Sequence, residues 1–172
     1  LRMEEFKVFQ EDTGRIDLSG AVMSASSTLG SGNAHVAITS DCCFHSANEY
    51  EAWWQIDLGS PRNIDKVEIT NRESIQNNVW ERINPFSVKV DGSTCAQDQN
   101  LGNGETKIIS CIAVGQTIRV QLQDKTSCLH FHTFNVFEEA IGVATVAAFG
   151  FPGRLVDHYP VGCFDEIFDR DF

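Results

Sequence analysis

A histidine and an arginine beside two expected strands are the side chains in this sequence best suited to bind a small polar molecule. His45 lies just ahead of the strand-like run 52–58, and Arg72 follows a second strand-like run, 64–70. Neighbouring strands of a β-sandwich end at a common rim, so we expect these two side chains to meet there. A guanidinium is a rigid fork of donors and a neutral imidazole donates or accepts, a combination that suits a hydroxyl-rich ligand such as a sugar.

Period-two alternation of apolar and polar residues predicts several short strands and no long helix. Clusters of Gly, Asn, Asp and Ser separate these runs. Many short strands at this spacing indicate an all-β fold, an antiparallel β-sandwich or jelly roll. Trp53 and Trp54, in the first run, are expected to be core and sheet-packing residues rather than ligand contacts. The expected strands are 52–58, 64–70, 85–91, 106–113, 117–123 and 129–137.

The first two runs also resemble a known family. The motif WWQIDLG at 53–59, followed by IDKVEITNR at 64–72, is similar to the F-type lectins (fucolectins), members of the discoidin-like, galactose-binding-like jelly rolls. Segments 16–21 and 24–28 resemble the family's first strand and the turn after it. The resemblance covers residues 15 to 139 and implies a secreted or extracellular domain that binds fucose or a related sugar.

The sugar-binding motif of this family is partly present. In F-type lectins a histidine is followed, after twenty-six residues, by Arg-x-Asp and, after four more, by Arg or Lys, and His45 and Arg72 match the first spacing. Ser74 stands in place of the aspartate and Val79 in place of the second basic residue, whereas Arg82 follows three residues later. A three-residue insertion reconciles the two patterns.

The resemblance implies that His45, Arg72 and Arg82 bind the sugar. An adjacent cysteine pair, which in the family presses against the apolar face of the sugar, is missing from this loop. Trp80 is expected to replace the cysteine pair by stacking, because aromatic faces suit the C–H face of a sugar.

Each of these residues also has a purely structural interpretation. His45 is then a loop histidine near a disulfide. Arg72 and Arg82 are then surface arginines paired with Glu73 and Glu81.

No metal ion or other cofactor is expected. Family members often hold Ca²⁺ between a loop after the first strand and an acidic residue on the last. In this chain the loop is shortened, and Asp41 is its one obvious carboxylate, whereas Ca²⁺ takes six to eight oxygen ligands. His130 and His132, at i and i+2 of a strand, suit a transition metal, but two isolated histidines are more often structural.

Six cysteines without the C-x-x-C pairs of a zinc site indicate disulfides and an extracellular compartment. The family resemblance pairs Cys95 with Cys111. It also implies a bond from Cys43 to the last strand, where Cys128 is the nearest replacement for the family's partner. The two remaining cysteines either bond each other or reach outside the fragment: Cys42 and Cys163.

The acidic composition limits the possible partners. A formal net charge of −11 at pH 7 disfavours nucleic acid and anionic lipid, both of which need clustered Lys and Arg. The longest apolar run, 141–151, is too short to span a bilayer. The chain starts at Leu1 without a signal peptide, which we interpret as a mature or excised fragment. The expected partners are a glycan or glycoprotein and neighbouring domains of the same chain.

The chain is expected to contain one central domain, residues 13–139, between two shorter pieces. Residues 1–11 echo residues 129–139 in register, so residues 1–12 resemble the last strand of a preceding repeat. A chance similarity between two alternating strands is the alternative. Residues 140–172 are interpreted as a linker and the start of a following Cys-containing module.

Three classes of function follow, in descending order. The first is a carbohydrate-binding (lectin) domain of an extracellular adhesion or recognition protein. The second is a discoidin-like protein-interaction or structural module that has lost sugar binding, which the changes at Ser74 and Val79 favour. An enzyme is disfavoured, because the sequence has no nucleophile-elbow motif and no spacing that suggests a triad.

Overall fold

The computed structural model describes residues 14–29, 34–38, 43–75 and 78–139. These residues form antiparallel β-sheets, which confirms the predicted all-β sandwich. Within the described ranges, no helix has the length and apolar character needed to cross a membrane. The expectations for residues 1–12 and 140–172, and for Asp41, Cys42 and Cys163, lie outside the described residues. The elements are β1 (Val22–Ala25), η1 (Ala34–Ile38), β2 (Phe44–Tyr50), β3 (Trp53–Thr70), η2 (Val79–Ile83), β4 (Phe86–Val90), β5 (Ser93–Gln99), β6 (Thr106–Leu122), β7 (Thr126–Phe131) and β8 (Thr133–Glu138), where η marks a 3-10 helix.

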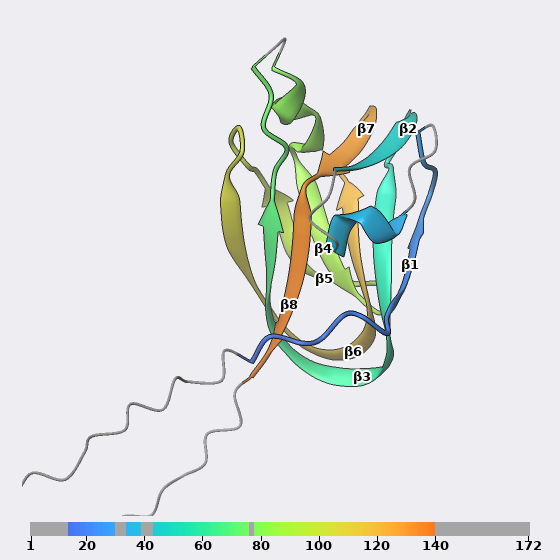
Figure 1. Ribbon diagram of the computed structural model, residues 1–172, viewed down its shortest axis with the longest axis vertical. Coiled ribbons are helices and arrows are strands. Elements are labelled where there is room, and N and C mark those ends of the chain that lie inside the picture. The colour runs from blue at the N-terminus through green and yellow to red at the C-terminus, as the bar shows by residue number, and fades with distance from the viewer. Residues whose placement is uncertain (1–13, 30–33, 39–42, 76–77, 140–172) are drawn as a thin grey trace, which may run out of the picture. The chain divides into compact units, whose positions relative to one another are not determined.

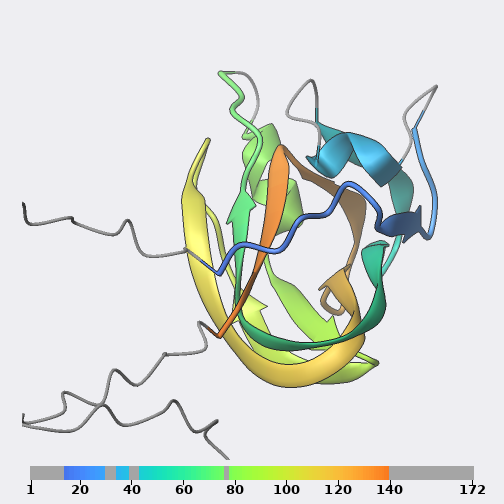
Figure 2. The same ribbon diagram turned by 60° about the horizontal axis from the view of Figure 1, so that its bottom comes forward.

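Two long strands, β3 and β6, build most of the sandwich. The first part of β3 pairs with the last part of β6, from Trp53–Gln121 to Asp57–Thr117, and the rest of β3 pairs with the first part of β6 and with β8. The register shifts after Asp57, where both strands curve around one end of the domain (Figures 1 and 2). Since an irregularity of this kind bends a strand, each long strand contributes to both layers.

The remaining strands extend these two. The main sheet has the order β1-β3-β6-β4-β5, with β8 on the other part of β3, and β2 pairs with β7 in a separate two-stranded ribbon. The segment 14–21 crosses β8 in both views, held by a bridge from Arg15 to Phe137 (Figures 1 and 2). All pairs are antiparallel, so strand ends and loops gather at the two ends of the sandwich.

The core is centred on Trp54. Its side chain is completely buried, and its ring centroid lies 5.3 Å from that of Phe131 and 4.8 Å from that of Phe134. The indole N–H donates a hydrogen bond of 2.8 Å to the carbonyl of Ala34, which ties η1 to the core. The neighbouring Trp53 faces outward, half-buried, with the guanidinium carbon of Arg119 4.3 Å from its ring centroid.

The strand boundaries differ from the expected ones in ways that follow from the curved strands. Runs 52–58 and 64–70 belong to one strand, β3, and runs 106–113 and 117–123 belong to one strand, β6, because the glycine-containing segments between them lie in the bends. Run 129–137 is divided at His132 into β7 and β8. Strands β1, β2 and β5 were not expected, and the first strand is Val22–Ala25 rather than 16–21.

One of the two expected disulfides is formed. Cys95 and Cys111 are bonded and join β5 to β6, as the family resemblance implied. The expected Cys43–Cys128 bond is wrong, because Cys128 carries a free thiol. Cys128 pairs across the β2–β7 ribbon with Asn48, which puts it roughly 15 Å along the ribbon from Cys43. A disulfide requires Cα atoms within about 7 Å of each other.

Truncating the two adjacent tryptophans should separate core packing from surface packing. Trp54→Ala is expected to lower the free energy of unfolding by about 3–5 kcal/mol, because it leaves a cavity in a closed aromatic cluster. Trp53→Ala, the matched control on the outer face of the same strand, should cost much less. Urea denaturation followed by circular dichroism measures both, and equal losses would contradict the assignment of Trp54 as the centre of the core.

Candidate functional site

His45 lies on β2, at the end of the sandwich where β3 ends and η2 follows (Figure 1). It pairs across the ribbon with His130 on β7, and the two imidazole rings stack with centroids 5.6 Å apart and planes 13° from parallel. The pairing of β2 with β7 and the stacking of the two rings together fix the direction of the His45 side chain. His45 is therefore a strand residue, and not the loop histidine of the structural interpretation.

The hydrogen bonds of His45 define what it offers to a ligand. Its Nδ1 atom lies 2.9 Å from the Ser46 carbonyl, which can only accept, so Nδ1 carries the proton in the neutral ring and Nε2 carries a lone pair. Burial lowers the pKa of His45, the Ser46 carbonyl raises it in part, and the charges of Arg72 and Arg82 lower it further. The ring is therefore neutral at pH 7 and presents an acceptor.

His130 anchors η2 to the β2–β7 ribbon. Its side chain is completely buried, and its Nε2 donates to the Val79 carbonyl at 2.7 Å. Burial lowers its pKa to about 4, and the charges of His45, Arg72 and Arg82 act in the same direction. Nδ1 of His130 is buried without a hydrogen-bond partner among the described residues. The sequence offered His130 as a structural or metal-binding residue, and the stacking against His45 was not foreseen.

Asn71 connects the loops at this end of the sandwich. It follows the last residue of β3, and its side chain is 1% exposed. Its amide nitrogen donates to the carbonyls of Trp80, at 3.0 Å, and Gly102, at 2.8 Å, while its amide oxygen accepts from the backbone N–H of Arg72 at 2.8 Å. Sequence reasoning assigned Asn71 no role. The available signal was an amide residue directly after a strong strand and directly before a candidate arginine.

Arg72 and Arg82 both lie close enough to the histidine pair to act on its charge. Each guanidinium lowers the pKa of His45 and of His130. Within the described ranges neither side chain takes part in an ion pair, so the expected alternative, pairing with Glu73 and Glu81, is not what these residues show. Arg72 is half-buried and Arg82 is exposed.

The position of Arg82 is explained by the geometry of η2. A 3-10 helix has three residues per turn and rises about 2 Å per residue, so side chains at i and i+3 lie on the same side, about 6 Å apart. Val79 and Arg82 stand in this relation on η2. The arginine is thus displaced by one turn from the position that the family motif assigns to a basic residue, without a change of face. Buried Ile83 holds the end of η2 against the core.

The other candidate, Trp80, is half-buried on η2, and its known contact is its carbonyl bond to Asn71. Its stacking against a sugar stays a prediction. Next to it in the chain, the residues 72–75 line an open hollow of about 390 Å³, in which His45 and Arg82 take no part. Ile75 in this hollow is 93% exposed, and the backbone N–H of Ser74 donates to Asn103 at 2.7 Å.

A jelly-roll sandwich of this topology is the fold of the galactose-binding-like, carbohydrate-binding domains. Residues 31–122 match the sequence model of the NedA-like, galactose-binding domain, and the chain belongs to this family. The expected membership of the discoidin-like superfamily, with fucolectins and carbohydrate-binding modules as structural neighbours, is thereby confirmed.

Three solved structures illustrate the similarity. The lectin domain of lectinolysin complexed with Lewis B antigen is 28% identical with a TM-score of 0.61, over 70% of this chain and 94% of that one. A fucolectin from striped bass (Morone saxatilis) serum is 21% identical with a TM-score of 0.62, over 69% and 45% of the two chains. The family 32 module of NanJ from C. perfringens, in complex with galactose, is 20% identical with a TM-score of 0.62, over 73% and 98%.

A curated relative, the pentraxin fusion protein of Xenopus laevis, is 26% identical over 113 residues. The match covers 60% of this chain and 26% of the relative, so the chain spans about a quarter of that protein. It likewise spans less than half of the striped bass fucolectin.

His130 should make the fold sensitive to acid in a defined range. A histidine in the unfolded chain binds a proton near pH 6.5, whereas His130 in the fold does so near pH 4, so acidification between these values favours unfolding. The loss approaches about 3 kcal/mol at pH 4. His130→Gln, which keeps a donor for the Val79 carbonyl, should flatten the dependence in chemical denaturation between pH 6.5 and 4. The pKa of His45 is also lowered, so His45 contributes in the same direction in both proteins. If the free energy of unfolding fell as steeply with pH in His130→Gln as in the wild type, a neutral buried His130 would be contradicted.

Asn71→Ala should loosen the loops that carry both arginines. The change leaves two carbonyls without their donor, which is expected to cost about 1–3 kcal/mol. Hydrogen exchange of the backbone amides at 72–75 and 79–83 should accelerate, because Arg72 loses its acceptor and η2 loses its tie to β3. Asn135→Ala, a change of the same type on the half-buried outer face of β8, is the control. Equal exchange in the two variants would show that Asn71 does not hold these loops.

Proposed function

We propose that this domain binds a neutral glycan at the rim formed by His45, Arg72 and Arg82, and that the ligand is fucose or a related sugar. One observation carries the proposal: the guanidinium groups of Arg72 and Arg82 both lower the pKa of His45, so both lie near its ring. This holds although Arg82 is three residues beyond the family position. Because Arg82 lies one turn of η2 beyond Val79, its side chain is on the same side of the helix as the position to which the motif assigns a basic residue.

The chemistry of the rim is complementary to a sugar. Neutral His45 offers the lone pair of Nε2 to a hydroxyl proton, while the two guanidinium groups donate to hydroxyl and ring oxygens. A sugar hydroxyl does both, so it can bridge an acceptor and a donor. Each such bond contributes about 1 kcal/mol net, so a single site should bind weakly, and several copies on one chain or surface would supply avidity.

The choice of sugar and the setting rest on relatives. The lectin domain of lectinolysin, which is 28% identical, is known in complex with Lewis B antigen, and this favours a fucose-containing glycan. The Cys95–Cys111 disulfide favours a secreted or extracellular protein with a role in recognition or adhesion. Trp80, on the same helix as Arg82, is the proposed stacking partner for the apolar face of the sugar.

A protein-interaction role is the second candidate, and one surface feature favours it. Ile108, Ile112 and Val114 on β6 are 60%, 81% and 72% exposed. The three residues alternate with more buried ones along β6, so their side chains face solvent on the same side, where they form an apolar stripe that Ser110 interrupts. Such a stripe suits contact with a protein rather than with a glycan.

Binding measurements on arginine variants test the proposal. Arg72→Ala and Arg82→Ala are each expected to weaken binding of a fucosylated glycan by roughly 10- to 100-fold, the equivalent of one or two hydrogen bonds from a charged donor. Arg62→Ala, which removes a surface arginine that pairs with Glu138, is the matched control and should bind normally. A glycan array followed by calorimetry measures all four proteins. Absence of binding by the wild-type domain to any glycan would leave the interaction role as the better explanation.

A further inference from the structure

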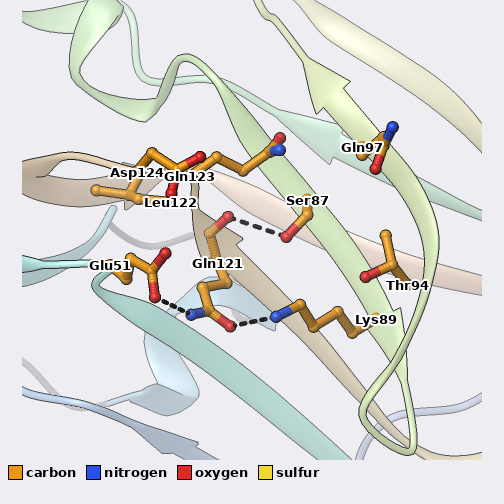
Figure 3. A pocket seen from close by; sticks show the side chains of 9 residues that line it. All are labelled: Glu51, Ser87, Lys89, Thr94, Gln97, Gln121, Leu122, Gln123 and Asp124. Atoms are coloured by element: carbon orange, nitrogen blue, oxygen red, sulfur yellow. Dashed lines mark hydrogen bonds between the residues drawn. The ribbon is translucent and has the colours of Figure 1, made fainter.

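A polar cavity, separate from the rim site, lies on the outer face of the main sheet, at the junction of β4, β5 and β6 (Figure 3). Its volume is about 160 Å³, and eight of its nine lining residues are polar or charged, with Leu122 the exception. Glu51, the residue directly after β2, borders the cavity. Since His45 lies six residues back along β2, the cavity is about 20 Å from the rim along the ribbon.

The centre of the cavity is held in place by Gln121. Its amide oxygen accepts from the ammonium group of Lys89 at 2.9 Å, and its amide nitrogen donates to Glu51 at 3.3 Å. Figure 3 shows this row of three side chains, which come from three different segments of the chain. A row fixed in this way presents donors and acceptors at set positions before any ligand arrives, which reduces the entropy lost on binding.

Ser87 supplies a buried hydroxyl with spare hydrogen-bonding capacity. The residue is 4% exposed, yet its hydroxyl lines the cavity. Its contact among the described residues is a long one, 3.4 Å to the carbonyl of Gln121. A hydroxyl has one proton and two lone pairs, so both lone pairs of Ser87 remain for a ligand.

The charges of the cavity narrow the ligand class. The carboxylates of Glu51 and Asp124 lie on one side and Lys89 lies on the other (Figure 3). Two carboxylates against one ammonium disfavour a phosphate or another anion. A lining with one apolar residue disfavours a lipid or an apolar peptide. The volume is below that of a typical drug-sized site and suits a single ring.

We infer that this cavity is a second saccharide subsite, which takes one neutral, hydroxyl-rich ring. Vicinal hydroxyls of the ring bond the row of Gln121, Lys89 and Glu51, while Ser87 accepts a further hydroxyl proton. The inference does not rest on the rim site, because the two share no residue. With both sites occupied, one copy of the domain engages two sugar units of a branched glycan or of neighbouring glycans.

Nuclear magnetic resonance titration of the whole chain tests the inference. The ¹⁵N-labelled protein is titrated with methyl glycosides of fucose, galactose, mannose and N-acetylglucosamine, up to about 100 mM, because a few hydrogen bonds give millimolar affinity. At least one glycoside is expected to shift the amides of Thr94, Gln121 and Gln123. Gln121→Leu and Ser87→Ala should each weaken this response at least tenfold. Gln55→Leu, the control, removes a glutamine that binds Arg119 on the same outer face but outside the cavity.

Arg72→Ala and inorganic phosphate complete the experiment. The cavity shifts should persist in Arg72→Ala, and phosphate should not reproduce them. If only the rim amides of the wild type shift, the second subsite is overturned and the rim site stands. If only the cavity amides shift, the rim site is overturned and the second subsite stands. Cavity shifts that vanish in Arg72→Ala, or that phosphate produces equally, would also overturn the inference, because they would reflect the rim or an anion.

Discussion

The amide of Asn71 is the interaction on which the proposed site depends. It lies where β3 ends, and with one buried side chain it binds the carbonyl of Trp80 on η2, the carbonyl of Gly102 and the backbone N–H of Arg72. Loops at the end of a sandwich have no ladder to hold them, so their positions depend on contacts of this kind. The ladder between β3 and β8 ends at Thr70, so beyond this point Asn71 is the side chain that joins the end of β3 to both segments that carry the arginines.

The site also requires that two buried or half-buried histidines stay neutral beside two arginines. Burial is the main reason that the pKa of His45 and of His130 is lowered, and the charges of Arg72 and Arg82 add to it. A protonated histidine here would add a third positive charge to the same rim. Neutrality has a functional consequence, because an imidazole with a free lone pair accepts a hydroxyl proton while the guanidinium groups donate. This combination of one acceptor and two donors is what the proposed binding of a neutral, hydroxyl-rich ligand requires.

The fold was predictable because its signal is local, whereas the strand pairing was not. Alternation in 53–59 and 64–70 identified the strands that form β3, and the motif identified the superfamily. Strand β2 was not predicted, because its sequence, FHSANEY, contains no β-branched residue and its apolar and polar residues alternate only in part. The error at Cys43 and Cys128 has the same origin: the register of β2 against β7 decides which residues face each other, and it depends on contacts between segments far apart in sequence.

The sequence predicts the position of a site residue where the number of residues between two motif positions also determines where their side chains lie. His45 and Arg72 follow from a fixed number of residues across β2 and β3, two strands that follow each other in the chain. Arg82 does not, because an insertion in a loop moves a side chain by an amount that depends on the conformation of the inserted residues. In a 3-10 helix three residues complete one turn, so an insertion of this length preserves the face, whereas an insertion of one or two residues would rotate the arginine away. In the proposed site, Arg82 therefore keeps its face because of η2 and its two anchors, the Val79 carbonyl bound to His130 and the buried Ile83.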